Sequence, residues 1–151
     1  MKNSIHRFLL FVVLLCLSGC ASATQFVALP DQKVDIENKE MARIYVLRPS
    51  SVGAAIPMAI KDGNDLIGDT GAESFLCWER NPGEIKITGK AENESWVKMY
   101  VDKGKKYYVL QRMQIGAFIS RNKLETLSEQ DGKKYFVKCK PPKVAIKKNK
   151  E

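Results

Sequence analysis

Apolar and polar residues alternate with a period of two along much of residues 41–127. The clearest run is 42–48, where Ala42, Ile44 and Val46 share one side of an extended chain until Pro49 ends the pattern. A period of two is typical of a half-buried β-strand. Further runs separated by turn residues are 54–61, 66–67, 73–79, 85–88, 95–101 and 106–113. About seven short strands with frequent turns predict an all-β fold, a small antiparallel β-sandwich.

Turn and cap residues divide these runs. Asp62, Gly63 and Asn64 are typical of a tight hairpin turn. Pro57 has no backbone N–H to donate, so the run 54–61 is expected at a sheet edge or at a bulge. Residues 115–126 are less regular and add at most one more strand. Ser128 followed by acidic residues predicts a short C-terminal helix over about 129–138, which would turn Phe136 and Cys139 inward.

The first nineteen residues have the pattern of an export signal. Lys2 and Arg7 precede an unbroken apolar run over 8–17. This run is well short of the roughly 20 residues that a membrane-spanning helix needs. A charged start, a short apolar run and small residues after it are typical of a secretory signal peptide. We therefore exclude residues 1–19 from the prediction of the fold.

The sequence Leu17-Ser18-Gly19-Cys20 resembles the lipobox of bacterial lipoproteins. The resemblance implies cleavage before Cys20, a diacylglyceryl thioether on its sulfur, and N-acylation, for example by palmitate. Several acyl chains together give stable membrane anchoring. Ala21 follows the cysteine where an aspartate would favour retention in the inner membrane. We therefore expect a lipid-anchored protein that faces the periplasm, with the outer membrane favoured over the inner.

A second resemblance covers residues 40–139. RIYVLRPSS (43–51), KDGNDLIGDTG (61–71), the turn at 81–83 and GKKYYV (104–109) are similar to a bacterial lipoprotein family of unknown function. That family carries a lipobox followed by a β-sandwich domain. The resemblance implies a prealbumin-like sandwich, and it implies no catalytic activity and no cofactor. Pro57 departs from the alternating pattern expected in the second strand.

Removal of the signal would change the inventory of reactive side chains. His6, the single histidine, leaves with residues 1–19, so the mature chain has none. This excludes Ser-His-Asp and Cys-His catalysis and histidine-ligated metals. With Cys20 acylated, Cys77 and Cys139 remain, and a pair of cysteines in an oxidising compartment predicts a disulfide. The alternative is a buried free thiol at Cys77. We expect no catalytic residue, no metal and no cofactor.

Charge is unevenly distributed along the chain. The formal net charge is +8, but residues 138–151 hold six lysines against one glutamate. We therefore expect a tether over 20–40, the sandwich over 41–139 and a basic flexible tail over 140–151. Lys147, Lys148 and Lys150 are candidates for contact with anionic envelope polymers, and a solubilising terminus is the alternative. The excess charge lies in the tail, so we expect no nucleic-acid partner.

Three residues of the domain are further candidates for interaction. Arg48 can meet an acidic partner, or it can pair with a surface carboxylate at the end of its strand. Trp78 and Trp96 can stack on sugar rings, although tryptophans on strands usually pack in the core or at its rim.

These observations predict a lipid-anchored, non-enzymatic binding or structural module of the bacterial cell envelope. The expected partner is an envelope protein or an anionic glycan rather than a small-molecule substrate. The alternative is an envelope hydrolase with carboxylate or Ser/Lys chemistry, which requires polar groups to converge in one pocket.

Overall fold

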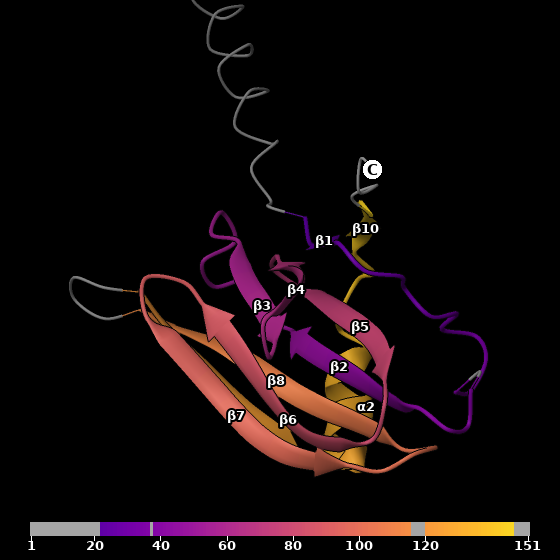
Figure 1. The fold of residues 1–151 in the computed structure, drawn as a ribbon. Coiled ribbons are helices and arrows are strands. Elements are labelled where there is room, and N and C mark those ends of the chain that lie inside the picture. The colour runs from indigo at the N-terminus through magenta and orange to yellow at the C-terminus, as the bar shows by residue number, and fades with distance from the viewer. Residues whose placement is uncertain (1–21, 37, 116–119, 147–151) are drawn as a thin grey trace, which may run out of the picture.

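The computed structural model describes residues 22–36, 38–115 and 120–146, which form ten strands and one helix (Figure 1). The strands are β1 (Thr24–Gln25), β2 (Ala42–Arg48), β3 (Met58–Asp62), β4 (Asp65–Thr70), β5 (Ser74–Arg80), β6 (Gly83–Lys90), β7 (Glu94–Val101), β8 (Lys106–Ile115), β9 (Ser120–Leu127) and β10 (Lys143–Val144). The helix is α2 (Glu129–Phe136). The prediction of an all-β domain is confirmed, with more strands than expected because β1, β9 and β10 lack a clear alternating pattern.

The strands form two sheets that enclose the main core. One sheet has the order β10-β1-β4-β3-β6-β7 and the other has the order β5-β2-β8-β9. Ile44 and Val46 of β2 lie between the sheets with Ile60 of β3 and Ile87 of β6, and all four are fully buried. Burial of these side chains, each worth about 1.5–3 kcal/mol, is the main force that holds the sheets together.

The expectation of purely antiparallel sheets is wrong for two strand pairs. β2 pairs with β8 in parallel, and β1 pairs with β10 in parallel. Parallel neighbours need a long connection because the chain must return to its starting end. Between β5, which pairs with β2 antiparallel, and β8, the chain crosses to the other sheet as the β6–β7 hairpin. That crossover allows β8 to return beside β2 in the same direction.

The helix covers the other face of the four-stranded sheet. Tyr45 of β2, Phe75 of β5 and Tyr108 of β8 form a second core with Phe136 of α2. The Phe136 ring centroid lies 5.3 Å from that of Tyr45 and 4.9 Å from that of Phe75. The predicted helix is confirmed. The Ser128 side chain caps it by accepting a hydrogen bond from the backbone N–H of Asp131.

The predicted tether and tail are in part wrong. Ala23 and Gln25 are buried, and β1 adds a short strand to the edge of the six-stranded sheet. On its outer side, β1 is paired by β10, so the folded domain begins near residue 23 and extends to β10. The sequence pattern did not show this because a two-residue strand has no periodicity. Lys147, Lys148 and Lys150 lie outside the described residues, as does Cys20. No helix among the described residues is long and apolar enough to cross a membrane.

Candidate functional site

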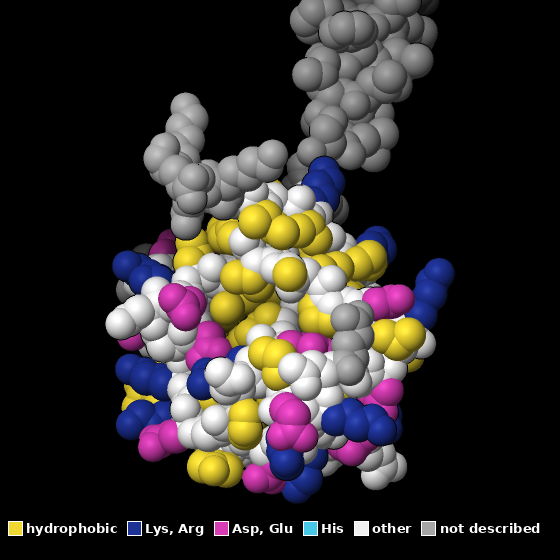
Figure 2. Space-filling view, turned by 45° about the vertical axis from the view of Figure 1, so that its right-hand side comes forward, with side chains coloured by type: hydrophobic (Ala, Val, Ile, Leu, Met, Phe, Trp, Pro, Cys, Tyr) yellow, Lys and Arg dark blue, Asp and Glu magenta, His cyan; other side chains and the backbone are white. Residues whose placement is uncertain are grey.

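An open groove of about 1380 Å³ lies between the two sheets at one side of the molecule. The first wall is the segment 26–30, which follows β1, and the second is the β3–β4 turn, at 62–67. Trp78 of β5 and Ile85 of β6 contribute to its lining and also belong to the main core. Figure 2 shows a hollow with hydrophobic side chains in its wall on this face. The groove thus runs along the edge of the core, where Trp78 and Ile85 themselves remain buried.

The polar side of the groove is organised around Asp62. The indole Nε1 of Trp78 donates a hydrogen bond to Asp62 Oδ2 at 3.0 Å, and the Arg80 guanidinium forms an ion pair with Oδ1 of the same carboxylate. Asp62 is the last residue of β3, whereas Trp78 and Arg80 share β5, so these bonds link the two sheets across the groove. Because both carboxylate oxygens are engaged, Asp62 holds the groove in shape.

A second ion pair lies beside the groove and fastens the segment that follows its first wall. Arg43 of β2 is fully buried and bonds to Glu79 of β5 through Nε and Nη2. Its remaining N–H groups donate to the backbone carbonyls of Asp31, Val34 and Asp35. The segment that follows the first wall is therefore fastened to the centre of the four-stranded sheet by one side chain.

Next to the groove, the outer surface of β6 and β7 carries lysines and aromatic side chains. We call this surface, with Lys61 of the neighbouring β3, the lysine–aromatic face; it consists of Lys61, Lys86, Lys90, Trp96, Lys98 and Tyr100. Two exposed carboxylates, Glu84 opposite Tyr100 and Glu94 opposite Lys90, lie at its two ends. Trp96 is 54% exposed and Tyr100 is 68% exposed. They point outward because the alternate residues of β7, Val97 and Met99, pack on the main core.

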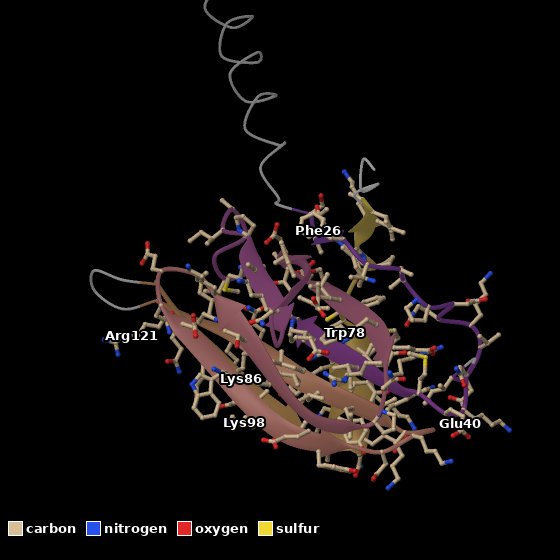
Figure 3. All side chains as sticks on the ribbon, viewed as in Figure 1. Phe26, Glu40, Trp78, Lys86, Lys98 and Arg121 are labelled. Carbon is tan, nitrogen blue, oxygen red and sulfur yellow. The ribbon has the colours of Figure 1, made fainter. Side chains whose placement is uncertain are left out.

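Two lysines stand directly opposite each other on this face. Lys86 of β6 pairs in register with Lys98 of β7, and Figure 3 shows that they come from adjacent strands. None of the ion pairs of the described residues includes either lysine. Like charges directly opposite in a sheet are destabilising. The Lys86 ammonium lies 5.4 Å from the Trp96 ring centroid, which is the distance of a cation–π contact.

The structure places the predicted interaction residues in three different environments. Trp96 is on the lysine–aromatic face, whereas Trp78 is 4% exposed and lies in the core at the floor of the groove. Arg48 is 1% exposed, and its guanidinium donates to backbone carbonyls of the neighbouring loop, among them that of Gly53 at 2.7 Å. The prediction of Arg48 as an interaction residue is therefore wrong. The strand turns this side chain inward, and a pattern of residue types does not show that.

The predicted disulfide between Cys77 and Cys139 is also wrong, since both cysteines are free. Both contact the second core, but their positions along β5 differ. Lys140 pairs with Ser74, which places Cys139 beside Glu73, four residues from Cys77. At roughly 3.3 Å per residue the two Cα atoms are about 13 Å apart along the strand. A disulfide requires less than about 7 Å.

Sequence reasoning missed Lys86, Lys98 and Tyr100. The signal was present, because Trp96, Lys98 and Tyr100 alternate along one strand and must share a face. What it did not show was that Lys86 lies opposite Lys98, which depends on the register of β6 against β7. Within the described part of the chain, no group of His, Cys, Asp and Glu side chains is arranged to hold a metal ion.

Comparison with known proteins adds one distant relative. The chain is 27% identical over 147 residues to a Haemophilus influenzae protein described as uncharacterized, and the match covers 91% of this chain and 84% of that protein. No protein-family model matches the chain, and no solved structure does.

Proposed function

We propose that the chain is a lipid-anchored, non-enzymatic binding module of the bacterial cell envelope that holds an anionic glycan on its lysine–aromatic face. The anchor is the acylated Cys20, and the domain faces the periplasm. This part of the proposal is supported by the lipobox-like sequence over 17–20 and the export signal before it. Ala21 after the cysteine favours the outer membrane.

The opposed pair of Lys86 and Lys98 carries the choice of ligand. Neither lysine is ion-paired among the described residues, and two cations held opposite each other are relieved of their repulsion when an anion lies between them. Trp96 and Tyr100 on the same surface offer flat apolar rings against which sugar rings pack. An acidic polysaccharide offers both kinds of contact: carboxylate groups that bind the lysines and sugar-ring faces that pack on the aromatic side chains.

The bonding of two of the carboxylates that line the groove, Asp62 and Glu79, supports binding rather than hydrolysis; Asp65 and Glu84 line it as well. General acid–base work needs a carboxyl group that is free to exchange a proton with the substrate. Both oxygens of Asp62 are instead bonded to Trp78 and Arg80. The nearby Glu79 is bonded to the buried Arg43.

Binding is tested with polygalacturonate as the acidic polysaccharide and dextran as the neutral control, in affinity electrophoresis of the mature chain carrying Cys20→Ser. We expect polygalacturonate, but not dextran, to retard the protein, and added salt to weaken the effect. Lys86→Gln/Lys98→Gln and Trp96→Ala should each reduce the retardation. Lys133→Gln/Lys134→Gln on the exposed side of α2 is the matched control. Equal retardation by dextran, or an equal loss in the α2 control, contradicts the proposed ligand.

The anchor is tested separately by fractionation. The wild-type chain should sediment with membranes and carry a lipid mass on its first mature residue, whereas Cys20→Ser should be released in soluble form. A Cys20→Ser protein that stays in the membrane fraction contradicts lipid anchoring.

A further inference from the structure

Strand β5 lies at the edge of its sheet, and part of that edge is covered by other segments of the chain. Phe75 N donates a hydrogen bond to Lys140 O at 3.2 Å. Two residues further along, the N–H and C=O of Cys77 are bonded to the side-chain amide of Gln25. Phe75 and Cys77 therefore direct these backbone groups away from β2, to the open side of β5.

The next residue of this alternation is Glu79, and its part of the edge is uncovered. In an antiparallel pair, alternate residues of a strand direct both backbone groups to the same side. The N–H and C=O of Glu79 must then point to the open side as those of Cys77 do, where β5 lines the groove. Among the described residues, no hydrogen bond reaches either group. An uncovered sheet edge is a template for pairing with an added extended chain.

The walls of the groove are apolar and already in place. Leu66 of the β3–β4 turn is 39% exposed, and Val27 and Leu29 of the first wall are half-buried. The ion pair between Asp62 and Arg80 joins the two sheets across the groove. A site that is preformed in this way avoids the entropic cost of ordering its walls when a ligand binds.

The charge in the groove is mainly acidic. Six charged side chains line it, four of them carboxylates, and Figure 2 shows acidic side chains beside the hollow. Two of the carboxylates are paired with arginines. Those of Asp65 and Glu84 are exposed, and neither belongs to an ion pair of the described residues. Lys86 also lines the groove, but its ammonium lies against the Trp96 ring.

We propose that the groove binds a partner protein through an extended, basic segment that pairs its backbone with Glu79, as an added strand of the four-stranded sheet. Apolar side chains of the segment pack on the walls of the groove, and its lysine or arginine side chains meet Asp65 and Glu84. In this mode of recognition the backbone hydrogen bonds provide affinity and the side-chain contacts provide specificity. The inference goes beyond the glycan that we propose on the lysine–aromatic face.

The test is an NMR titration of the isotope-labelled mature chain carrying Cys20→Ser with the peptide Lys-Val-Lys-Val-Lys, blocked at both ends. We expect the backbone amide signals of Glu79 and of residues 62–67 to shift, and added salt to weaken the binding. Glu-Val-Glu-Val-Glu is the control peptide and should leave these signals unchanged. Absence of shifts with the basic peptide, or equal shifts with the acidic one, overturns the proposal. Shifts of the same signals when the protein alone is concentrated would identify a second copy as the occupant and also overturn it.

Charge complementarity is tested with two double variants. Asp65→Asn/Glu84→Gln should weaken binding of the basic peptide about fivefold, since each exposed ion pair contributes modestly. Glu94→Gln/Glu129→Gln is the matched control, because it removes the same charge at exposed positions that do not line the groove. It should leave the affinity within about twofold. An equal loss in both variants shows that net charge alone is responsible and overturns the assignment to the groove.

Backbone pairing with β5 is tested with two N-methylated forms of the basic peptide. Methylation of the valine nitrogens and methylation of the lysine nitrogens remove N–H groups from opposite edges of an extended chain. The form that loses the donor facing Glu79 should bind about fivefold more weakly than the other, because a backbone hydrogen bond is lost. Affinities of the two forms that agree within about twofold contradict pairing with this strand and overturn the proposal.

Discussion

The side-chain amide of Gln25 pairs with the backbone of Cys77 as a neighbouring strand would. Gln25 Oε1 accepts a hydrogen bond from Cys77 N at 3.0 Å, and Gln25 Nε2 donates to Cys77 O at 2.8 Å. The same Nε2 also contacts the carbonyl of Ala28 at 3.0 Å. Cys77 lies on β5, an edge strand, so the fully buried Gln25 satisfies polar groups that no other strand reaches.

Gln25→Ala should therefore destabilise the domain strongly. The substitution leaves the buried N–H and C=O of Cys77 without partners, and each unsatisfied group costs about 1–3 kcal/mol. We expect the free energy of unfolding, measured in urea, to fall by about 2–4 kcal/mol. Gln130→Ala, at an exposed position of α2, is the control and should change it by less than about 0.5 kcal/mol. A loss of similar size in both variants would contradict the role of the amide.

Gly132→Ala should destabilise the protein although alanine is the better helix former. A Cβ atom at residue 132 would lie 2.2 Å from Tyr108 Cγ and 2.7 Å from its Cβ. Those atoms belong to the stiff part of the side chain, so the whole helix must move away. We expect a loss of about 1–3 kcal/mol in urea unfolding, against a gain of about 1 kcal/mol from helix propensity alone. A variant as stable as the wild type would show that α2 is not held closely against Tyr108.

The alternating pattern predicted the strands that pack on the main core. In β7 it reflects one packed and one exposed face, whereas β2 is buried on both faces because α2 covers the second one. It did not predict β1 and β10, which are too short to show a period. Their place depends instead on contacts such as that of Gln25 with Cys77, between residues 52 positions apart. Ser128 predicted the helix because its cap is local in sequence.

The candidate site was predictable only in part for the same physical reason. The alternation of side chains along β7 is enough to predict that Trp96 and Tyr100 share one face. Three further features depend on the register between strands. They are the opposition of Lys86 and Lys98, the buried position of Arg48, and the separation of Cys77 from Cys139. A shift of register by one residue turns every side chain of a strand to the other face, and composition carries no information on that choice.

Alkaline pH should destabilise the helix-covered side of the domain. Burial raises the pKa of the Cys77 thiol to about 11, and burial also raises the pKa values of the Tyr45 and Tyr108 hydroxyls. At pH values below the pKa that a group has in the unfolded chain, the group is neutral in both states and its burial stabilises the fold in full. As the pH rises, the unfolded chain loses these protons first, and the free energy of unfolding falls until the pH reaches the pKa of the group in the folded state.

For Cys77 the affected range runs from about pH 9 to about pH 11, with a loss of roughly 2–3 kcal/mol at its upper end. The measurement is urea unfolding at a series of pH values across that range. Cys77→Ala should flatten the decline because it removes one of the titrating groups. Cys139, whose pKa burial also raises to about 11, and the tyrosines leave a residual slope. A Cys77→Ala profile parallel to that of the wild type would contradict the assignment to this thiol.

Arg48 is, with Arg43, a fully buried arginine of the described residues, and its contacts organise a loop. Its Nη1 donates to the carbonyl of Ile56 at 2.7 Å, and its Nη2 donates to those of Val52 and Gly53 at 3.2 and 2.7 Å. It also reaches Thr70 O in β4 at 3.3 Å. The loop between β2 and β3 therefore folds around the guanidinium. Burial lowers the pKa of Arg48, but arginine remains protonated at neutral pH.

Arg48→Lys should loosen this loop, because an ammonium has three donors on a compact head and cannot span carbonyls held by a planar fork. We expect the free energy of unfolding to fall by about 2–4 kcal/mol, since some buried carbonyls lose their donor. Amide hydrogen exchange should rise selectively over residues 50–57, whereas a general loss of stability would raise exchange throughout the chain. Arg112→Lys is the control: that side chain is half exposed in its pair with Glu125, and its replacement should change stability by less than about 1 kcal/mol. Because loss of the fork acts first on the loop, faster exchange at 50–57 should already be measurable under conditions in which the sheets remain fully folded.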